Sequence, residues 1–165
     1  EFIPVFKRFY QQIGQNAEEV DITYRSQLSD GSFATLLQAS AKKDALTQYT
    51  NVGVHKDDLL FTIKGHPVKK FGSQGQQKSF IIALRLSQFD WLKQHKGQKP
   101  ILLLDDIFDK LDNERVSRLI ALVSADYFGQ VLITDTDPER MQALFSQLPG
   151  ETQLFQIKDQ QAIAL

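Results

Sequence analysis

The sequence predicts an α/β fold preceded by a helical segment. Two short apolar runs without alternation, Ile101–Leu104 and the QVLIT run Gln130–Thr134, are typical of strands buried on both faces of a parallel sheet. Helical patterns lie before, between and after them, and such alternation gives a sheet with crossover helices. The length of 165 residues, with 42% apolar and 24% charged residues, suits a globular domain and excludes a disordered or collagen-like chain.

The first third of the chain is predicted to be mostly helical. Residues 1–15 carry apolar side chains at a three-and-four spacing, which predicts an amphipathic helix that ends at Gly14. The alternating stretch Val20–Arg25 predicts a half-buried strand, and Ser32 is placed to cap a second helix that runs to about Leu46. Two short strands are expected in residues 57–71, joined at Lys64–Pro67 where Gly and Pro interrupt the apolar runs.

The later part predicts a regular succession of elements. A long helix is expected over Ser73–Gln94, ended by Gly97 and Pro100. Helices are also expected over residues 113–123 and 138–148, on either side of the second apolar run. Residues 152–157 and 162–165 predict a terminal hairpin.

Charge and composition narrow the class of protein. The net charge is −1, but residues 56–99 hold nine Lys and Arg against three Asp and Glu, whereas residues 100–140 hold four against nine. The absence of cysteine excludes disulfides and thiolate zinc sites, and the three histidines have no metal-site spacing. No apolar run approaches the roughly 18–20 residues that span a bilayer, so we expect a cytoplasmic protein without a membrane anchor.

The first chemical motif is ILLLDDIFDKLD, residues 101–112. A buried parallel strand that ends in two carboxylates places them at the ligand-binding edge of an α/β sheet. In a nucleotide-hydrolysing site, the first carboxylate, Asp105, would hold hydrated Mg²⁺, and the second, Asp106, would polarise the attacking water. The alternative is a strand followed by an ordinary acidic turn, and this segment alone does not decide between the two.

The second motif is FGSQGQQKS, residues 71–79, directly before the long helix. Free backbone N–H groups and the helix dipole favour an anion at a helix N-terminus, so Ser73 and Gly75 are candidate phosphate contacts. The alternative is that Ser73 only caps the helix, and if this motif is considered alone, that alternative is preferred.

The order of these motifs resembles the second half of an ATP-binding-cassette head. Ser73–Gln76 resembles the signature loop, Ile101–Asp106 the Walker B strand, and Lys110–Asp112 the loop that follows that strand. Within this superfamily the sequence is most similar to the RecF family of SMC-type ATPases. GVHKDDL, residues 53–59, is similar to that family's G-P-H-R-D-D-L, and the match covers about half of the chain in the family's order.

The resemblance implies the C-terminal part of an ABC/SMC-type P-loop ATPase head, with residues 1–52 as a helical arm or lobe and residues 53–165 as the head. It implies ATP and Mg²⁺ as cofactors and an ATP-dependent homodimer, in which the signature loop acts in trans and the Walker B carboxylates act in cis. It further implies binding to gapped DNA and single-strand to double-strand junctions, with RecR and RecO as partners, and RecA loading in recombination, replication, repair and the SOS response. The residues assigned by this resemblance are Asp105 for the metal, Asp106 for catalysis, and Ser73, Gln74, Gly75, Gln76 and Asp112 for the nucleotide.

Several features depart from the family's pattern. The chain contains no G-x-x-x-x-G-K-[ST] loop, so we expect that alone it neither binds ATP tightly nor hydrolyses it. It starts at Glu1 inside a helical pattern, and we expect it to be part of a longer protein. Val54 replaces a proline of the family, and Lys56 and Lys78 replace arginines, which keeps the charge but loses bidentate geometry. Asp135 stands where the family's switch histidine is expected and is left out of the catalytic set.

Other assignments remain open at the level of sequence. Lys69 and Lys70 are candidates for DNA-backbone contacts, although lysines on a hairpin more often keep an edge strand soluble. His55 lies near the expected nucleotide or caps a turn, and its isolation favours the turn. Two other classes compete with a RecF-like ATPase: another SMC-like or transporter cassette, and a non-catalytic module that keeps the cassette fold to bind DNA or protein.

Overall fold

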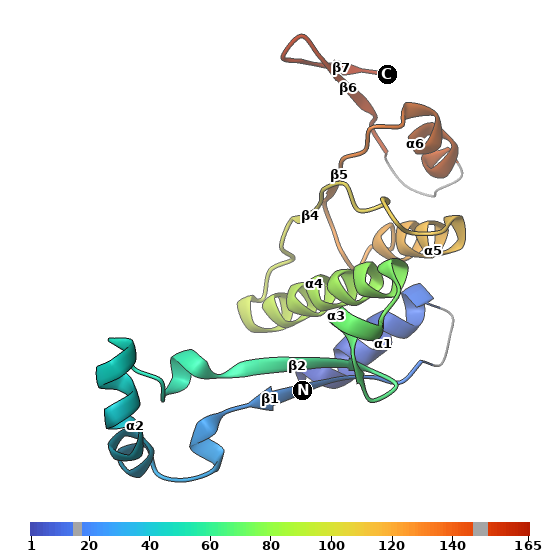
Figure 1. The fold of residues 1–165 in the computed structure, drawn as a ribbon. Coiled ribbons are helices and arrows are strands. Elements are labelled where there is room, and N and C mark those ends of the chain that lie inside the picture. Colours follow the sequence, from blue (N-terminus) through green and yellow to red (C-terminus); the bar gives the residue numbers. More distant parts are fainter. Residues whose placement is uncertain (15–17, 147–151) are drawn as a thin grey trace. The chain divides into compact units, whose positions relative to one another are not determined.

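The computed structural model describes residues 1–14, 18–146 and 152–165. By packing, the chain forms two units (Figure 1). One comprises Glu1–Ala17 and Ser73–Leu165, and the other comprises Glu18–Gly72. The expected domain boundary between residues 52 and 53 stays a prediction. The packing units have other bounds, because the first helix packs with the residues after Gly72. Within the described ranges, no helix is both long enough and apolar enough to cross a bilayer.

The core of the first unit is built on two helices, α1 (Phe2–Gly14) and α4 (Gln74–Lys96). The predicted face of α1 is buried, and the rings of Phe6 and Phe80 lie 4.6 Å apart between centroids. Phe128 extends the same core, with its ring 5.0 Å from that of Phe89 on α4. Aromatic pairs at these separations add to the gain from burying apolar surface, so α4 is held firmly along one side.

Helix α4 begins and ends where the sequence indicated. The Ser73 hydroxyl accepts a hydrogen bond from the Gln76 amide at 3.2 Å, and the Gln76 side chain accepts one from the Ser73 amide at 2.7 Å. This reciprocal capping box satisfies two of the N–H groups that a helix leaves unpaired at its start. At the other end Gly97 takes a left-handed conformation with φ of 65°, which glycine adopts at little cost.

The parallel sheet of the first unit has two strands, β4 (Leu102–Leu104) and β5 (Val131–Ile133), with Leu102 opposite Val131. The crossover between them includes α5 (Asn113–Val123), whose start and end match the prediction. The prediction of strands buried on both faces was wrong, since Leu103 is 68% exposed whereas its neighbours Leu102 and Leu104 are buried. The cause is that in the described residues only one face of this pair of strands is covered.

The last elements are α6 (Pro138–Phe145) and a hairpin of β6 (Phe155–Lys158) and β7 (Gln161–Ala164). The predicted helix over 138–148 is confirmed as far as Phe145, while its residues 147 and 148 lie outside the described ranges. The hairpin is confirmed as a separate antiparallel ladder, with Phe155 opposite Ala164.

The second unit is an antiparallel sheet with short helices. Strand β1 (Val20–Arg25) pairs with β2 (Asp58–Ile63), and β2 pairs with β3 (His66–Pro67). Between β1 and β2 lie η1 (Gln27–Ser29), α2 (Phe33–Thr47), which Ser32 caps as predicted, and η2 (Val54–Lys56). The prediction of a second strand after the Lys64–Pro67 joint was wrong: β3 lies within that joint, and the residues that follow form the short helix α3 (Val68–Phe71). Pro67 is the residue directly before this helix, and its backbone is not helical, with ψ of 122°.

Candidate functional site

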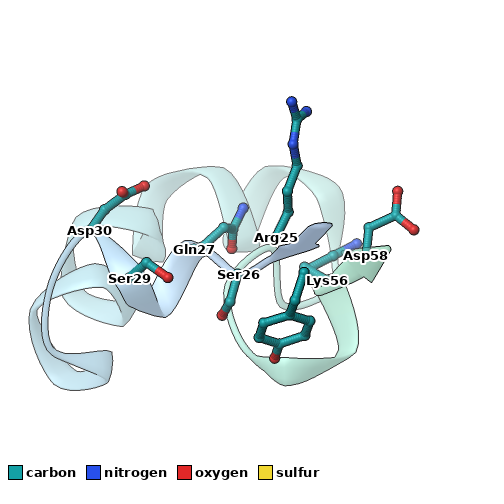
Figure 2. A pocket seen from close by; sticks show the side chains of 8 residues that line it. Arg25, Ser26, Gln27, Ser29, Asp30, Lys56 and Asp58 are labelled. Carbon is teal, nitrogen blue, oxygen red and sulfur yellow. The ribbon is translucent and has the colours of Figure 1, made fainter. Parts of the chain in front are cut away.

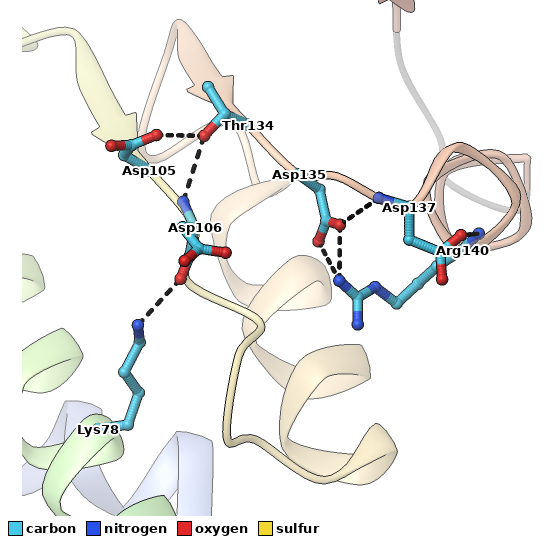
Figure 3. A network of polar contacts seen from close by, with 7 residues as sticks. All are labelled: Lys78, Asp105, Asp106, Thr134, Asp135, Asp137 and Arg140. Carbon is cyan, nitrogen blue, oxygen red and sulfur yellow. Dashed lines mark hydrogen bonds and ion pairs between the residues drawn. The ribbon is translucent and has the colours of Figure 1, made fainter.

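The two predicted carboxylates lie where the carboxyl ends of the parallel strands meet. Asp105 and Asp106 directly follow β4, and Thr134 directly follows β5 (Figure 3). The Thr134 hydroxyl donates a hydrogen bond to Asp105 Oδ1 and accepts one from the Asp106 amide at 3.2 Å. Both aspartates are exposed, so their carboxylates are open to a ligand from solvent.

The start of α4 lies beside the same edge of the sheet. Lys78 Nζ donates a hydrogen bond to the Asp106 carbonyl oxygen at 2.9 Å (Figure 3). Asp106 has a φ of 46°, in the left-handed region that few non-glycine residues adopt. This turn therefore aims the carbonyl of Asp106 at the helix that carries the predicted signature loop.

Gly75 links that loop to the segment after the two aspartates. A Cβ atom built on Gly75 would come within 2.5 Å of Arg115 Nη1 and 3.3 Å of the Lys110 carbonyl oxygen. Asp112 caps α5 through a hydrogen bond from the Arg115 amide to its Oδ1 at 2.8 Å. Gly75 of the 73–76 segment thus lies beside Lys110 of the 105–112 segment, although the two segments are about 30 positions apart in the sequence.

For Ser73 and Asp112 the structure also supports a simpler role, that of a helix cap. The Ser73 hydroxyl and the Asp112 carboxylate both act as helix caps. A cap uses the side chain while other N–H groups of the first turn remain for an anion, so capping and phosphate binding can coexist. The roles of Ser73, Gln74, Gly75, Gln76 and Asp112 toward a nucleotide stay predictions.

Asp135, at the position of the family's switch histidine, is occupied in an ion pair. Its side chain is 1% exposed, and Arg140 Nη2 lies 2.6 Å from Oδ1 and 2.5 Å from Oδ2 (Figure 3). The Asp137 amide also donates to Oδ1 at 2.7 Å. Burial by itself would raise the pKa of the Asp135 carboxyl, but the bonds from Arg140 and from the backbone outweigh it, and the pKa lies below its usual value.

The remaining predicted residues lie in the second unit. Lys69 and Lys70 are exposed on α3 and not on a hairpin, so the edge-strand explanation does not fit them. His55 Nε2 lies 2.9 Å from the Thr50 carbonyl oxygen, which supports a turn-stabilising role. These residues belong to the second unit, whereas Asp105 and Asp106 belong to the first.

The second unit also contains a polar pocket of about 490 Å³ next to the GVHKDDL motif (Figure 2). Lys56 and Asp58 of that motif line it, with Arg25 from the end of β1. Beside it, hydrogen bonds from the Tyr24 and Ser26 side chains hold the pKa of the Asp57 carboxyl below its usual range. The pocket contains none of the residues that the sequence singled out for nucleotide or metal.

Sequence reasoning missed Thr134, the contact of Lys78 with Asp106, and the partner of Asp135. The sequence did contain a signal for Thr134. Parallel strands end at the same edge of a sheet, and Thr134 follows β5 as Asp105 follows β4. The other two contacts depend on where α4 and α6 pack, which no local pattern specifies.

A magnesium ion fits this edge of the sheet as a partner of one carboxylate. Thr134 engages only Oδ1 of Asp105, which leaves the carboxylate its second oxygen. In residues 1–14, 18–146 and 152–165 no group of three or more His, Cys, Asp or Glu side chains could hold a metal. Mg²⁺ commonly keeps several waters and takes phosphate oxygens beside one or two carboxylates, so the donor set is compatible with it.

Comparison with known proteins shows that the chain is similar in sequence to RecF proteins. No family model matches it. The chain is 54% identical over 144 residues to the DNA replication and repair protein RecF of Flavobacterium johnsoniae, covering 87% of this chain and 40% of the relative. It is 43% identical to RecF of Phocaeicola vulgatus, over 96% of this chain and 43% of the relative, and 43% identical to RecF of Porphyromonas gingivalis, over 98% and 44%.

Solved structures agree in fold. The RecF-ATP form of the recombination mediator protein RecF in the RecFOR pathway matches with a TM-score of 0.69 and 25% identity, over 99% of this chain and 43% of that chain. The RecF-ATPrS form matches with a TM-score of 0.72 and 24% identity over the same shares. A structure from work on ATP-driven dimerisation and DNA-stimulated activation of SMC ATPases matches with a TM-score of 0.57 and 12% identity, over 99% and 83%.

These comparisons confirm the predicted fold class, since the chain shares the α/β fold of the matching parts of the solved RecF and SMC ATPase structures. The chain spans 40–44% of the length of the curated relatives described above. It is therefore a homologue of RecF proteins and matches their C-terminal part.

Proposed function

We propose that this chain forms the rear part of the ATPase head of a RecF-type DNA repair protein. It contributes the Walker B carboxylates to one ATP and the signature loop to an ATP held by a second head. The observation that supports the proposal is the position of each motif: Asp105 and Asp106 are exposed directly after β4, at the carboxyl end of the parallel strands, and Ser73–Gln76 forms the N-terminus of α4.

The roles of the residues follow from this arrangement. Asp105 would hold Mg²⁺, which supplies positive charge beside the transferred phosphoryl group, and Asp106 would take a proton from the attacking water. The N–H groups at the start of α4, with Ser73 and Gly75, would meet phosphate oxygens. The phosphate-binding loop that the sequence lacks would have to come from another segment, so we expect the chain alone to be inactive.

The ATPase proposal is tested by Asp106→Asn in the complete gene product. Because the amide cannot accept a proton, ATP turnover should fall by at least roughly 100-fold. Asp109→Asn, an exposed carboxylate of the same turn, is the matched control and should leave turnover unchanged. Full turnover in Asp106→Asn would contradict the proposal and would favour the non-catalytic binding module.

We further propose that Lys69 and Lys70 contact the DNA backbone, as gap-directed repair with RecR, RecO and RecA would require. Both side chains are exposed on α3, next to each other in sequence. The RecFOR pathway of the solved RecF structures supports such a context for the relatives.

The test is charge reversal, Lys69→Glu with Lys70→Glu, measured on gapped DNA. Affinity should fall, and the slope of log affinity against log salt should decrease by about two, since each phosphate contact contributes roughly 0.9. The pair Lys42→Glu with Lys43→Glu on the exposed α2 carries the same charge change and serves as the control. An unchanged salt slope in the first pair would remove these lysines from the interface.

A further inference from the structure

Thr134 contacts three consecutive residues at the end of β4. Its amide donates a hydrogen bond to the Leu104 carbonyl oxygen at 3.0 Å, which continues the parallel ladder by one step. Its hydroxyl reaches the next two residues, Asp105 through the carboxylate and Asp106 through the backbone amide (Figure 3). One side chain thus links both predicted carboxylate residues.

The direction of these bonds follows from chemistry. The Asp106 amide can only donate, so the Thr134 oxygen accepts there at 3.2 Å. A hydroxyl has a single proton, and it is then left for Asp105 Oδ1. Asp105 therefore accepts at Oδ1, and its second carboxylate oxygen is left for a cation.

The same contact fixes the turn that carries the second carboxylate. Asp106 has left-handed backbone geometry, with φ of 46°. Its amide is held by Thr134 and its carbonyl by Lys78 at 2.9 Å, so its peptide groups are held on both sides. The direction of the Asp106 side chain depends on this backbone, and small errors of position at a reacting group cost large factors in rate.

We propose that Thr134 is a positioning residue of the ATPase site: its hydroxyl holds the Asp105 carboxylate toward the metal and the Asp106 backbone in the geometry that its base role needs. The inference rests on the proposed function and adds a residue outside the motifs that the resemblance assigns. Thr134→Val is the informative change, because valine has nearly the same shape and suits a strand end but lacks the hydroxyl. Thr134→Ser keeps the hydroxyl and is the matched control.

The first readout is amide hydrogen exchange in this chain, which needs no ATP. Exchange at Asp106 should be faster by roughly tenfold or more in Thr134→Val, because its amide loses its acceptor, and should stay close to the parent in Thr134→Ser. The Leu102 amide, bonded to the Gln130 carbonyl at 3.0 Å, is an internal reference for the ladder. Unchanged exchange at Asp106 in Thr134→Val, with the reference intact, would overturn the proposal.

The second readout is catalysis by the complete gene product. Thr134→Val should lower kcat, or raise the Mg²⁺ concentration for half-maximal rate, by roughly 10- to 100-fold, as for other residues that orient a metal-binding carboxylate. KM for ATP should change little, and Thr134→Ser should restore most of the rate. Thermal unfolding shows whether the valine variant has folded. If it has not, the serine variant provides the test: a rate as low as that of an inactive variant would contradict a role that needs only the hydroxyl.

The two proposals fail in different ways. If Asp106→Asn abolishes turnover while Thr134→Val is as active as the parent, the ATPase assignment stands and the role of Thr134 is refuted. If Asp106→Asn leaves turnover unchanged, the proposed function fails, while the amide exchange at Asp106 still tests whether Thr134 holds the turn.

Discussion

Two acidic turns follow the two parallel strands, and they use their charges differently. After β4, Asp105 and Asp106 are exposed, and the Asp105 carboxylate meets the neutral hydroxyl of Thr134. After β5, the side chain of Asp135 is 1% exposed and both of its oxygens accept hydrogen bonds from Arg140. One turn presents carboxylates to solvent, whereas the other uses its carboxylate to attach α6 to the end of the strand.

The difference shows why an acidic residue at a sheet edge is not by itself a site. A buried carboxylate that is already neutralised by an arginine has little charge left for a cation or a water. The Arg140 guanidinium also lies 5.7 Å from the centre of the Phe108 ring, in the segment that follows Asp106. Arg140 thus links the β5 turn to the segment after the β4 turn, and the catalytic role proposed above falls to the β4 turn.

The largest expected effect comes from removing the cation of the buried pair. Arg140→Leu leaves the Asp135 carboxylate buried without its partner, and we expect a loss of roughly 2 kcal/mol in the free energy of unfolding, reduced by the partial exposure of Arg140. Urea unfolding of the chain measures it. Lys99→Met, which breaks the exposed pair with Asp126, is the control and should cost at most about 1 kcal/mol. Equal losses of stability in both variants would mean that the Arg140–Asp135 pair contributes no more than an exposed ion pair, which would contradict its role in packing.

Local patterns predicted the boundaries of individual elements well. Ser32 and Ser73 cap helices as expected, because a serine hydroxyl accepts an N–H bond from the first turn and so marks where a helix begins. The strand Val20–Arg25 and the helix Asn113–Val123 also have the predicted bounds. These features depend on residues that are close in sequence.

Features that depend on distant residues were not predicted. The exposure of Leu103 depends on what covers the sheet, and the grouping of α1 with α4 depends on contacts such as Phe6 with Phe80. Asp135 could be placed from the order of motifs, but its pairing with Arg140 requires the start of α6 to turn back toward β5. The roles of the candidate site residues stay predictions, and the contacts that link them, such as Thr134 with Asp105 and Lys78 with Asp106, were not predicted.

The second expected effect is on the pH dependence of stability. The pKa of Asp135 lies below its usual value in the folded chain, so its contribution is present above about pH 4 and is lost as the pH falls through the lower, folded pKa. Asp135→Asn should therefore be less stable than the parent near pH 7 and lose less stability on acidification below about pH 4. Unfolding in urea from pH 3 to pH 7 measures this, with Asp109→Asn as the control from the exposed turn. Parallel curves for Asp135→Asn and the parent would contradict it.

A third and smaller effect separates stability from activity within the exposed turn. Asp106 has a positive φ, which glycine adopts more easily, so Asp106→Gly should keep or raise stability, by up to about 1 kcal/mol. The same variant should lose turnover in the complete gene product because the carboxylate is gone. Asp105→Gly, at a residue outside the left-handed region, should instead lower stability by roughly 0.5–1 kcal/mol. If Asp106→Gly were less stable than Asp105→Gly, the Asp106 carboxylate would itself stabilise the β4 turn, which would contradict this prediction.

The smallest effect concerns the link between α4 and the β4 turn. Lys78 donates to a carbonyl oxygen in an exposed contact, so Lys78→Met should cost only about 0.5 kcal/mol in unfolding free energy, and Lys78→Arg should cost less because a donor remains. The same urea experiment measures both variants. A loss near the 2 kcal/mol expected for Arg140→Leu would show that the β4 turn depends on its cation as strongly as the β5 turn does. In that case both turns would serve packing to a similar degree, and the contrast between an open β4 turn and a packed β5 turn would be refuted.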